Sequence, residues 1–342
     1  MIFADVPLSQ AEGAIAAHSI RLGDLVIKKG VVLTAQHLKG LAALAIDRVT
    51  IARLEADDTD ENTAAARLAQ SLLGDNVMAH GPATGRANLF ATADGLLQVD
   101  ANRIDAMNMV DEALTVATLP HWRVVQRGEM VATVKIIPFA VPSALVERSF
   151  SAAGAQSPVS IAAFKPLRAG LIATSLPGLK PAVIRKTSDV LAKRLQLGHA
   201  SLVSEVLVAH KSADVADAMV RMGGEVDLMV LFGASAMTDR RDVLPVAIEQ
   251  AGGSIIHFGL PVDPGNLLLL GQWTRPDGRT IPVIGAPGCA RSPKENGFDW
   301  VLQRFMAGLQ VTRSDMMRMG HGGLLMEIVQ RGQLRADLGA VE

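Results

Sequence analysis

Two short apolar stretches, each ending in a glycine turn, most strongly constrain the fold of this chain. VDLMVLFG (226–233) and IPVIGAPG (281–288) have the pattern of buried strands, and polar residues follow each of them. A third turn, VDPGN (262–266), lies between the two. In an open α/β sheet, ligands bind in the crevice outside the carboxyl ends of the strands. We therefore expect Gly233 and Gly285 to mark two strand ends that open onto such a crevice.

Strand and helix patterns alternate from about residue 151 onward. The strand-like stretches and the amphipathic helices between them follow in this order: 159–164, 168–178, 186–198 (helix), 200–210 and 212–222 (helix). Alternation at this spacing predicts a mainly parallel sheet with helices on both faces. We therefore expect residues 151–342 to form one α/β domain.

The first 150 residues differ in pattern and divide into two smaller modules. Residues 1–75 combine hairpin-like alternation with an alanine-rich helix, which indicates a small α/β module. Ser9 and Glu12 have the spacing of a capping box, which predicts a short helix. Residues 76–150 are rich in strand patterns broken by proline and glycine, and Asp94-Gly95 predicts a hairpin turn. We expect this second module to be β-rich or barrel-like.

The composition argues against several classes of function. The 342-residue chain has a net charge of −1, 4% aromatic residues and no tyrosine, so a nucleic-acid-binding surface is not expected. One cysteine, Cys289, is too few for a disulfide framework or a cysteine-rich zinc site. No apolar run approaches the roughly 18–20 residues of a membrane span, and the first residues lack a signal-peptide pattern. We expect a cytoplasmic protein without membrane contact.

The residues after the strand at 226–233 are suited to binding an anion. Small residues at a strand end let backbone N–H groups approach a phosphate closely. Those residues are Gly233, Ala234 and Ser235. The strand at 168–175 ends in a turn at Thr174 and Ser175, which we add to the candidate substrate-binding residues.

Two carboxylates in the same loop suggest a metal site. Asp239 and Asp242 could hold Mg²⁺, which prefers carboxylate, water and phosphate oxygens, and both are candidate catalytic residues. Arg240 lies between them and could offset phosphate charge. The structural alternative is that Asp242 caps a helix that begins at Val243. Capping and ligand contact are compatible, so both interpretations stay open.

The two remaining loops supply further candidates. Pro264-Gly265 is a turn signal that would place Asn266 toward the crevice, although a simple turn explains the same pattern. The loop after the strand at 281–286 gathers small residues and cations, a plausible anion cradle: Gly285, Pro287, Gly288, Cys289, Arg291, Ser292 and Lys294. Cys289 could act as a nucleophile only with a neighbouring base, so a packed side chain is the favoured interpretation.

Three segments in this order carry a resemblance to a known family. FGASAMTDRRDVLPVAIEQAGG, DPGNLLLLG and PVIGAPGCARS resemble the molybdopterin-binding domain of MogA/MoaB and MoeA proteins. In that family a Gly-Gly-x-Ser loop, a Pro-Gly turn and a Gly-x-Pro-Gly loop follow one another. The resemblance covers about residues 165–310. Residues 14–55 are more loosely similar to the MoeA stretch that precedes this domain, and residues 76–150 show no similarity.

The three segments match the family pattern at Asp242 and depart from it at several other positions. Asp242 corresponds to the functional aspartate of the MogA motif. Phe232 stands in place of the first glycine, and Asn266 in place of the lysine that follows Pro-Gly in MoeA. Cys289 replaces an asparagine common after the last Pro-Gly, and Leu244 replaces a threonine of the MogA motif.

The resemblance implies a protein of molybdenum cofactor biosynthesis, expected as a homo-oligomer. It implies either Mg-ATP-dependent adenylylation of molybdopterin or insertion of molybdate. Asp239 and Asp242 would hold the metal, the backbone near Gly233 and Gly288 would grip the phosphates, and cations would balance their charge. Those cations are Arg240, Arg291 and Lys294.

Two alternatives remain open at the level of sequence. A non-catalytic module could hold molybdopterin or the finished cofactor and pass it to a molybdoenzyme or a nucleotidyltransferase partner; the altered loop positions favour this. A CinA-like nucleotide hydrolase is the third possibility, because that family uses a related domain.

Overall fold

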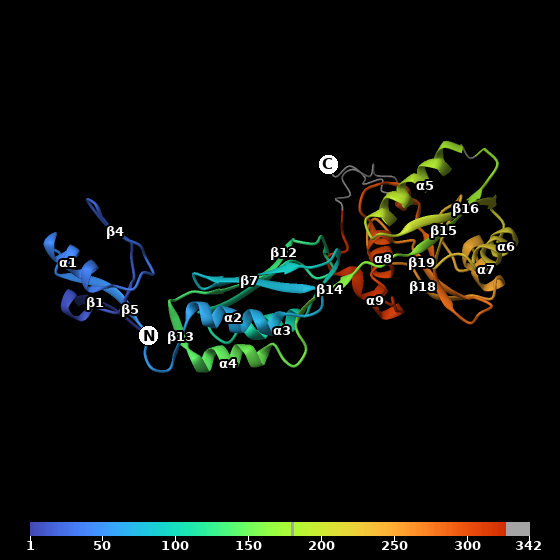
Figure 1. Ribbon diagram of the computed structural model, residues 1–342. Helices are drawn as coiled ribbons and strands as arrows, with labels where there is room; N and C mark the ends of the chain where they lie inside the picture. Colours follow the sequence, from blue (N-terminus) through green and yellow to red (C-terminus); the bar gives the residue numbers. More distant parts are fainter. Residues whose placement is uncertain (179–180, 326–342) are drawn as a thin grey trace, which may run out of the picture. The chain divides into compact units, whose positions relative to one another are not determined.

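The computed structural model describes residues 1–178 and 181–325, and the chain divides into two compact units. The first unit comprises residues 1–163 and the second begins at Phe164. Figure 1 shows the elements of each unit. None of the helices within the described residues has the length and apolar character needed to cross a membrane.

The second unit is built on a six-stranded sheet in the order β16-β15-β17-β20-β19-β18. All of its strands run parallel except β19, which is antiparallel to both of its neighbours. The strands are β15 (Arg168–Ser175), β16 (Ser201–Ala209), β17 (Leu228–Phe232), β18 (Ser254–Phe258), β19 (Leu269–Thr274) and β20 (Thr280–Ala286). The predicted α/β fold with a mainly parallel sheet is confirmed.

Helices cover both faces of this sheet. Met229 and Leu231 of β17 belong to the apolar core beneath α6 (Ser212–Met222) and α7 (Val243–Gln250). Successive side chains of a strand point to opposite faces of the sheet, so Phe232 lies on the face opposite to that of Leu231. Its ring lies 6.2 Å from the ring of Phe298 in α8 (Gly297–Met306), measured between centroids. The helix α5 (Pro181–Gln196) lies beside α8, because Arg194 stands 5.7 Å from the same Phe298 ring.

The carboxyl ends of three neighbouring strands therefore meet at one edge. Strands β15, β17 and β20 lie side by side and parallel, and end at Ser175, Phe232 and Ala286. All five residues of β17 are buried, as a central strand covered on both faces requires. The loops that follow these strands are the ones singled out from the sequence.

The first unit contains two separate apolar cores. The smaller core gathers buried residues between Ala11 and Ile51. Its elements are β1 (Ile2–Pro7), η1 (Leu8–Gln10), β2 (Ile15–Ala16), β3 (Ile20–Leu22), β4 (Leu25–Ile27), α1 (Ala35–Ala43) and β5 (Arg48–Arg53). The helix predicted near Ser9 is a single 3-10 turn without a side-chain cap, so the capping box predicted there is wrong.

The larger core of the first unit gathers buried residues between Ala64 and Ile161. Four strands form one sheet in the order β10-β12-β8-β7, and three form another in the order β11-β9-β14. The helices are α2 (Glu61–Leu72), α3 (Ala101–Asn108) and α4 (Ser143–Ala152). The strands are β6 (Asp58–Asp60), β7 (Val77–Ala83), β8 (Arg86–Ala91), β9 (Gly95–Val99), β10 (Leu114–Thr118), β11 (Val124–Val125), β12 (Met130–Ile136), β13 (Ala140–Pro142) and β14 (Val159–Ala163).

The structure differs from the expected boundaries at two places. The strand β14 pairs with β9 in the first unit, although its pattern was assigned to the α/β domain from residue 151. The helix α2 packs its alanine and leucine face into the larger core, so residues from about 58 onward belong with the β-rich part. Partner strands far away in sequence decide both cases, and a local pattern does not identify them.

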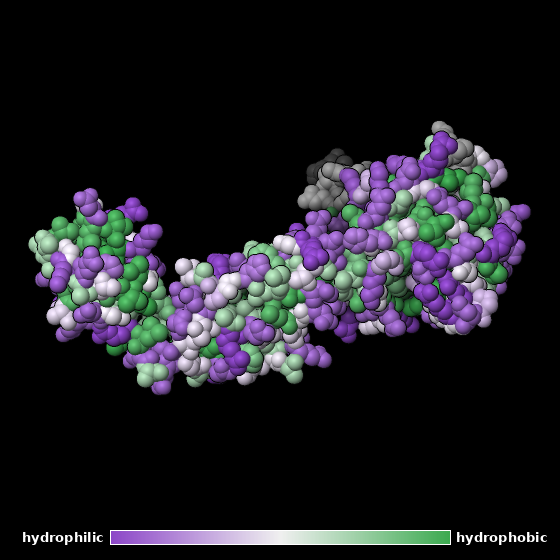
Figure 2. Space-filling view, viewed as in Figure 1, coloured by the Kyte–Doolittle hydropathy of each residue, from purple (hydrophilic) through white to green (hydrophobic). Residues whose placement is uncertain are grey.

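The predicted hairpin at Asp94-Gly95 is also wrong. The strands on either side, β8 and β9, lie in different sheets. The hairpin forms instead between β7 and β8, where Thr84 and Gly85 both have positive φ angles of 49° and 67°. Two residues of positive φ are what a two-residue hairpin turn requires. Figure 2 shows hydrophobic residues at the surface of both units. Met109 and Leu197 are among the exposed large apolar side chains.

Candidate functional site

A buried hydroxyl ties three strand ends of the second unit together. Thr174, at the end of β15, is only 1% exposed. Its Oγ1 accepts the N–H of Ala234 at 2.7 Å and is hydrogen-bonded to Nδ1 of His210 at 2.8 Å. The His210 N–H in turn donates to the carbonyl of Ser175 at 2.9 Å. The turn after β17 is therefore fixed to the ends of β15 and β16.

The first candidate loop begins with a close turn at Gly233. A Cβ at this position would lie 2.7 Å from the carbonyl oxygen of Ser235, so only glycine fits without a shift. The N–H of Ala234 is committed to Thr174, whereas Ser235 is exposed. The predicted approach of backbone N–H groups to an anion therefore cannot use the Ala234 N–H as it stands.

The loop then leads into α7 through Asp242. Asp242 is the N-cap of the helix, and its Oδ1 accepts the N–H of Val243 at 2.7 Å. Its Oδ2 accepts the N–H of Thr238 at 3.4 Å. The capping interpretation of Asp242 is confirmed, and a role in ligand contact stays a prediction.

Asp239 forms an ion pair within the same loop. Its Oδ1 lies 2.7 Å from Nε of Arg241, and its Oδ2 lies 3.3 Å from Nη2. The Arg241 N–H donates to the same carboxylate at 2.9 Å. The side-chain and backbone hydrogen bonds from Arg241 lower the pKa of Asp239 to about 2. Both side chains are largely exposed, at 51% and 90%.

This arrangement does not fit a magnesium site. Both oxygens of Asp239 are occupied by Arg241, and both oxygens of Asp242 accept backbone N–H groups. Within the part of the chain that the structure describes, no cluster of three or more His, Cys, Asp or Glu side chains could hold a metal ion. A metal at the two aspartates would first have to displace Arg241.

The loop after β20 reaches back to the loop after β17. Arg291 lies in η2 (Gly288–Arg291), the 3-10 turn that follows Pro287. Its Nη2 donates to the carbonyl of Gly233 at 2.9 Å, and its guanidinium carbon lies 5.1 Å from the centroid of the Phe232 ring. One side chain thus joins two of the three predicted loops at the sheet edge. Phe232, the departure from the family's glycine, supplies the ring that Arg291 packs against.

The charge of Arg291 has no counter-charge among residues 1–178 and 181–325. Its Nε is buried and has no hydrogen-bond partner there, and its guanidinium donates to the Gly233 carbonyl alone within those residues. Burial lowers the pKa of the guanidinium, but an arginine stays protonated in proteins. Burying a charge without a partner is unfavourable. An anionic ligand at this edge would supply the missing counter-charge.

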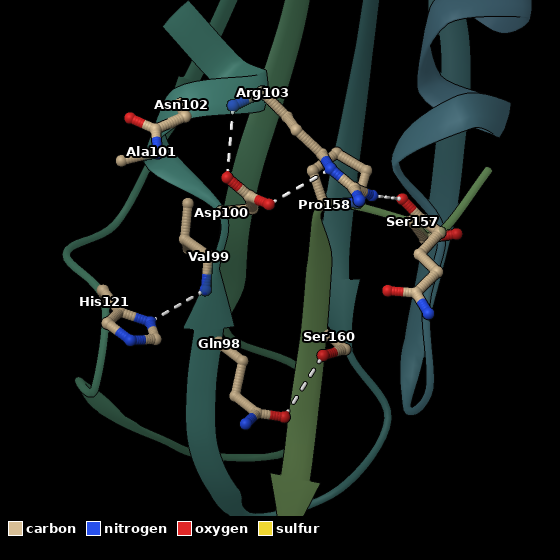
Figure 3. A pocket seen from close by; sticks show the side chains of 11 residues that line it. Gln98, Val99, Asp100, Ala101, Asn102, Arg103, His121, Ser157, Pro158 and Ser160 are labelled. Atoms are coloured by element: carbon tan, nitrogen blue, oxygen red, sulfur yellow. Dashed lines mark hydrogen bonds and ion pairs between the residues drawn. The ribbon is translucent and has the colours of Figure 1, made fainter. Parts of the chain in front are cut away.

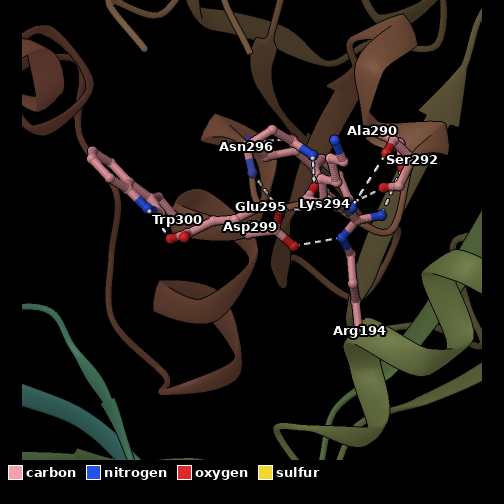
Figure 4. A network of polar contacts seen from close by, with 9 residues as sticks. Arg194, Ala290, Ser292, Lys294, Glu295, Asn296, Asp299 and Trp300 are labelled. Atoms are coloured by element: carbon pink, nitrogen blue, oxygen red, sulfur yellow. Dashed lines mark hydrogen bonds and ion pairs between the residues drawn. The ribbon is translucent and has the colours of Figure 1, made fainter. Parts of the chain in front are cut away.

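A second arginine holds the rest of the loop. Figure 4 shows Arg194 of α5 reaching into the segment 288–296, which we call the cationic loop because it carries Arg291 and Lys294. Arg194 donates to the carbonyls of Ala290, Ser292 and Lys294 at 2.6, 2.7 and 3.2 Å. Its Nε lies 2.5 Å from Oδ1 of Asp299 in α8. Burial raises the pKa of Asp299, and the bond to Arg194 opposes that shift.

The turn at 262–266 packs against the start of α8. The Asp263–Pro264 peptide bond is cis, and the Pro264 carbonyl accepts the N–H of Gly297 at 2.8 Å. Gly265 has a φ of 137°, and a Cβ on it would lie 2.6 Å from the Gly297 nitrogen. Asn266 is exposed, while its carbonyl accepts the N–H of Leu260. The turn therefore supports the base of the cationic loop.

The remaining predicted residues divide into surface and interior positions. Gly285 lies inside β20, where a Cβ would meet Leu269 at 2.9 Å, so its small size serves strand packing. Cys289 is partly buried, and Ser292 accepts the N–H of Lys294 at 3.3 Å. The side chains at the surface are those of Ser235, Arg240 and Lys294, and Gly288 is exposed as well.

Two contributors were not predicted from the sequence. His210 and Arg194 make their contacts through strands and helices that are distant in sequence from the glycine turns. His210 directly follows β16, so its place at a strand end was a usable signal. Arg194 stands in a helix with the ordinary amphipathic pattern, and nothing local distinguishes it.

The first unit contains a separate polar hollow of about 500 Å³ near the start of α3 (Figure 3). Its charged groups satisfy one another, since Arg103 forms an ion pair with Asp100 at 3.1 Å. The ring of His121 accepts the Val99 N–H at 3.0 Å, and Ser160 is bonded to Gln98 at 3.4 Å. The arginine of this hollow thus has a carboxylate partner, which Arg291 lacks among the described residues.

Comparison with known proteins gives likenesses among solved structures. No family model matches the chain, and no curated protein matches it. A molybdopterin biosynthesis MoeA protein from Pyrococcus horikoshii is 15% identical with a TM-score of 0.32, over 90% of this chain and 75% of that chain. A molybdenum cofactor biosynthesis protein from Pyrococcus furiosus is 12% identical with a TM-score of 0.27, over 91% and 66% of the two chains.

A third solved structure, of a smaller protein, is similar at a comparable identity and TM-score. The molybdopterin biosynthesis enzyme MoaB from Thermus thermophilus is 14% identical with a TM-score of 0.28, over 42% of this chain and 97% of that chain. Identity and TM-score are low in all three of these likenesses.

Proposed function

We propose that the carboxyl edge of the second unit's sheet binds molybdopterin through its terminal phosphate, as part of molybdenum cofactor biosynthesis. One observation carries the proposal: Arg291 bridges the loops after β17 and β20 and has no counter-charge among the described residues. A guanidinium matches the geometry of phosphate oxygens and binds them with two parallel hydrogen bonds. The order of the three loops, which resembles the molybdopterin-binding domain, supplies the identity of the ligand.

The residues have distinct parts in this proposal. Arg291 would contact the phosphate, and Lys294 would add a second positive charge from the same loop. Thr174 and His210 hold the turn at Gly233 against the strand ends, which fixes the acceptor of Arg291 in place. Binding of this kind depends on positioned charges in a partly water-excluded site.

Adenylylation would need Mg²⁺ in addition to the bound pterin. Asp239 pairs with Arg241 and Asp242 caps α7, so neither carboxylate is free to hold the metal. The uncompensated Arg291 favours ligand binding whether or not turnover follows. A module that binds the pterin and passes it to a partner is therefore the second candidate.

The decisive experiment titrates molybdopterin anaerobically into the wild-type protein and into Arg291→Met, with pterin fluorescence as the signal. We expect the wild type to bind molybdopterin and the variant to bind it about hundredfold more weakly, since the bound phosphate would lose its charged partner. A pterin without phosphate is the control and should bind weakly to both. Equal binding of molybdopterin by the two proteins would contradict the proposal.

A second arm separates the two roles. Mg²⁺ and ATP are added to the molybdopterin complex, and the mixture is examined for adenylylated pterin. Product that disappears with Asp242→Asn would support the adenylyltransferase. Tight binding without product would support the carrier.

A further inference from the structure

The cationic loop is held from behind by one side chain of a distant helix. Arg194 is 7% exposed and stands in α5, about a hundred residues before the loop. Its N–H groups donate to three loop carbonyls, those of Ala290, Ser292 and Lys294. The contacts alternate along the loop, so they fix its path over five residues rather than at one point.

Asp299 fixes the guanidinium that makes these contacts. It pairs with Nε of Arg194 at 2.5 Å, and its Oδ2 lies 3.4 Å from Nη2. The same Oδ2 accepts the N–H of Asn296 at 2.9 Å, which closes the capping box at the start of α8. The planar fork of arginine can serve a carboxylate and several carbonyls at once, which the compact ammonium of lysine cannot.

The direction of the carbonyls affects the charge that the loop presents. The three oxygen atoms point toward Arg194, so they are not available to neutralise the cationic side chains of the loop. Among the described residues, Arg291 and Lys294 form no ion pair. The loop thus directs the negative ends of these three peptide dipoles toward Arg194, while the carboxylate of Glu295 in the same loop accepts the indole N–H of Trp300.

We infer that Arg194 and Asp299 form a positioning pair that holds the cationic loop in the shape that binds an anion. The inference rests on the proposed function for the site at which the anion binds. Neither residue contacts the ligand; both act through the backbone of residues 290–294 and thereby through Arg291. A site of this kind depends on the shell that supports the contacting residue.

The test uses inorganic pyrophosphate as the probe, measured by titration calorimetry with the full chain. Arg194→Lys keeps the charge but loses the fork, and we expect pyrophosphate to bind about tenfold more weakly. Hydrogen exchange of the backbone amides in 288–297 should become faster, while exchange in β17 stays the same. The matched control is Arg304→Lys, because Arg304 is a buried arginine of α8 whose Nη1 donates to the Trp300 carbonyl of its own helix.

A second variant guards against a general loss of stability. Arg194→Met combined with Asp299→Asn removes both charges and keeps an acceptor for the Asn296 N–H; replacing both members of a buried pair is often tolerated. We expect it to melt cooperatively, to bind pyrophosphate at least about tenfold more weakly and to show the faster loop exchange. Arg304→Lys should stay within about twofold of the wild type.

The outcomes separate this inference from the proposed function. Folded Arg194 variants that bind pyrophosphate as tightly as the wild type would overturn the inference and leave the proposed function standing. A wild-type protein that does not bind pyrophosphate would count against the proposed function. In that case unchanged loop exchange in the Arg194 variants would overturn the inference as well.

Discussion

Two loops at the same sheet edge each contain an arginine, and the two arginines differ in exposure and in ion pairing. In the loop after β17, Arg241 is 90% exposed and pairs with Asp239 two residues earlier. In the loop after β20, Arg291 is partly buried and lies against Phe232. Among the described residues its guanidinium donates to the Gly233 carbonyl alone, and its buried Nε has no hydrogen-bond partner. Arg241 forms an ion pair within its own loop, and Arg291 forms none with any described residue.

This difference between the two arginines supports the proposal that the loop after β20 binds the ligand. An exposed ion pair contributes little to stability, and it leaves no net charge to attract an anion. A partly buried cation without a partner lowers stability unless something compensates it. The sequence pattern predicted a metal and catalytic residues in the first loop and an anion cradle in the second. The arginine without an ion pair among the described residues lies in the second loop.

The support of the cationic loop can be broken from the side of the turn at 262–266. Gly265→Ala places a Cβ 2.6 Å from the Gly297 nitrogen and forces alanine to a φ of 137°. We expect a loss of about 3 kcal/mol in the free energy of unfolding. Urea denaturation followed by circular dichroism measures it. Gly224→Ala is the control, because a Cβ there meets no atom within 4 Å; equal stability of the two variants would refute the packing argument.

The other loop can be loosened at its buried hydroxyl. Thr174→Val leaves the Ala234 N–H and the His210 ring without their partner, and we expect a loss of about 2 kcal/mol. Thermal and urea unfolding provide the measurement. Thr187→Val serves as the comparison, since that buried hydroxyl donates to the Val183 carbonyl four residues earlier in α5. A larger loss of stability in Thr187→Val than in Thr174→Val would contradict this role of the Thr174 hydroxyl.

The smallest effect is expected at the exposed pair. Because Arg241 lowers the pKa of Asp239 to about 2, Arg241→Ala should return that pKa toward 3.8. A lowered folded-state pKa means that the pair stabilises the loop above about pH 4, and that this contribution is lost as the pH falls toward 2. Carboxyl chemical shifts in an NMR titration report the change. An unchanged midpoint in the variant would show that the pair does not form.

Much of the second unit could be predicted from the sequence because the signals are local. The apolar runs at 228–232 and 281–286 are buried strands, and the glycine turns follow them. The N-cap at Asp242 could be read from its place before an apolar helix. Such features depend on backbone propensity and burial within a few residues.

The features that could not be predicted from the sequence depend on contacts between residues far apart in the chain. Arg194 meets the cationic loop about a hundred residues later, and β14 finds its partner β9 about sixty residues earlier. The ion pair between Asp239 and Arg241 could have been predicted, since the two residues are only two positions apart. Metal binding and ion pairing, however, both require the same carboxylate. Geometry decides between them, and spacing alone does not.

In the proposed function, Arg291 and not Arg241 provides the binding charge at this sheet edge. The most direct measurement titrates pyrophosphate into the wild type, Arg291→Met and Arg241→Met by calorimetry. We expect about hundredfold weaker binding for Arg291→Met and a change within about twofold for Arg241→Met. Equal losses for the two variants, or a larger loss for Arg241→Met, would contradict it.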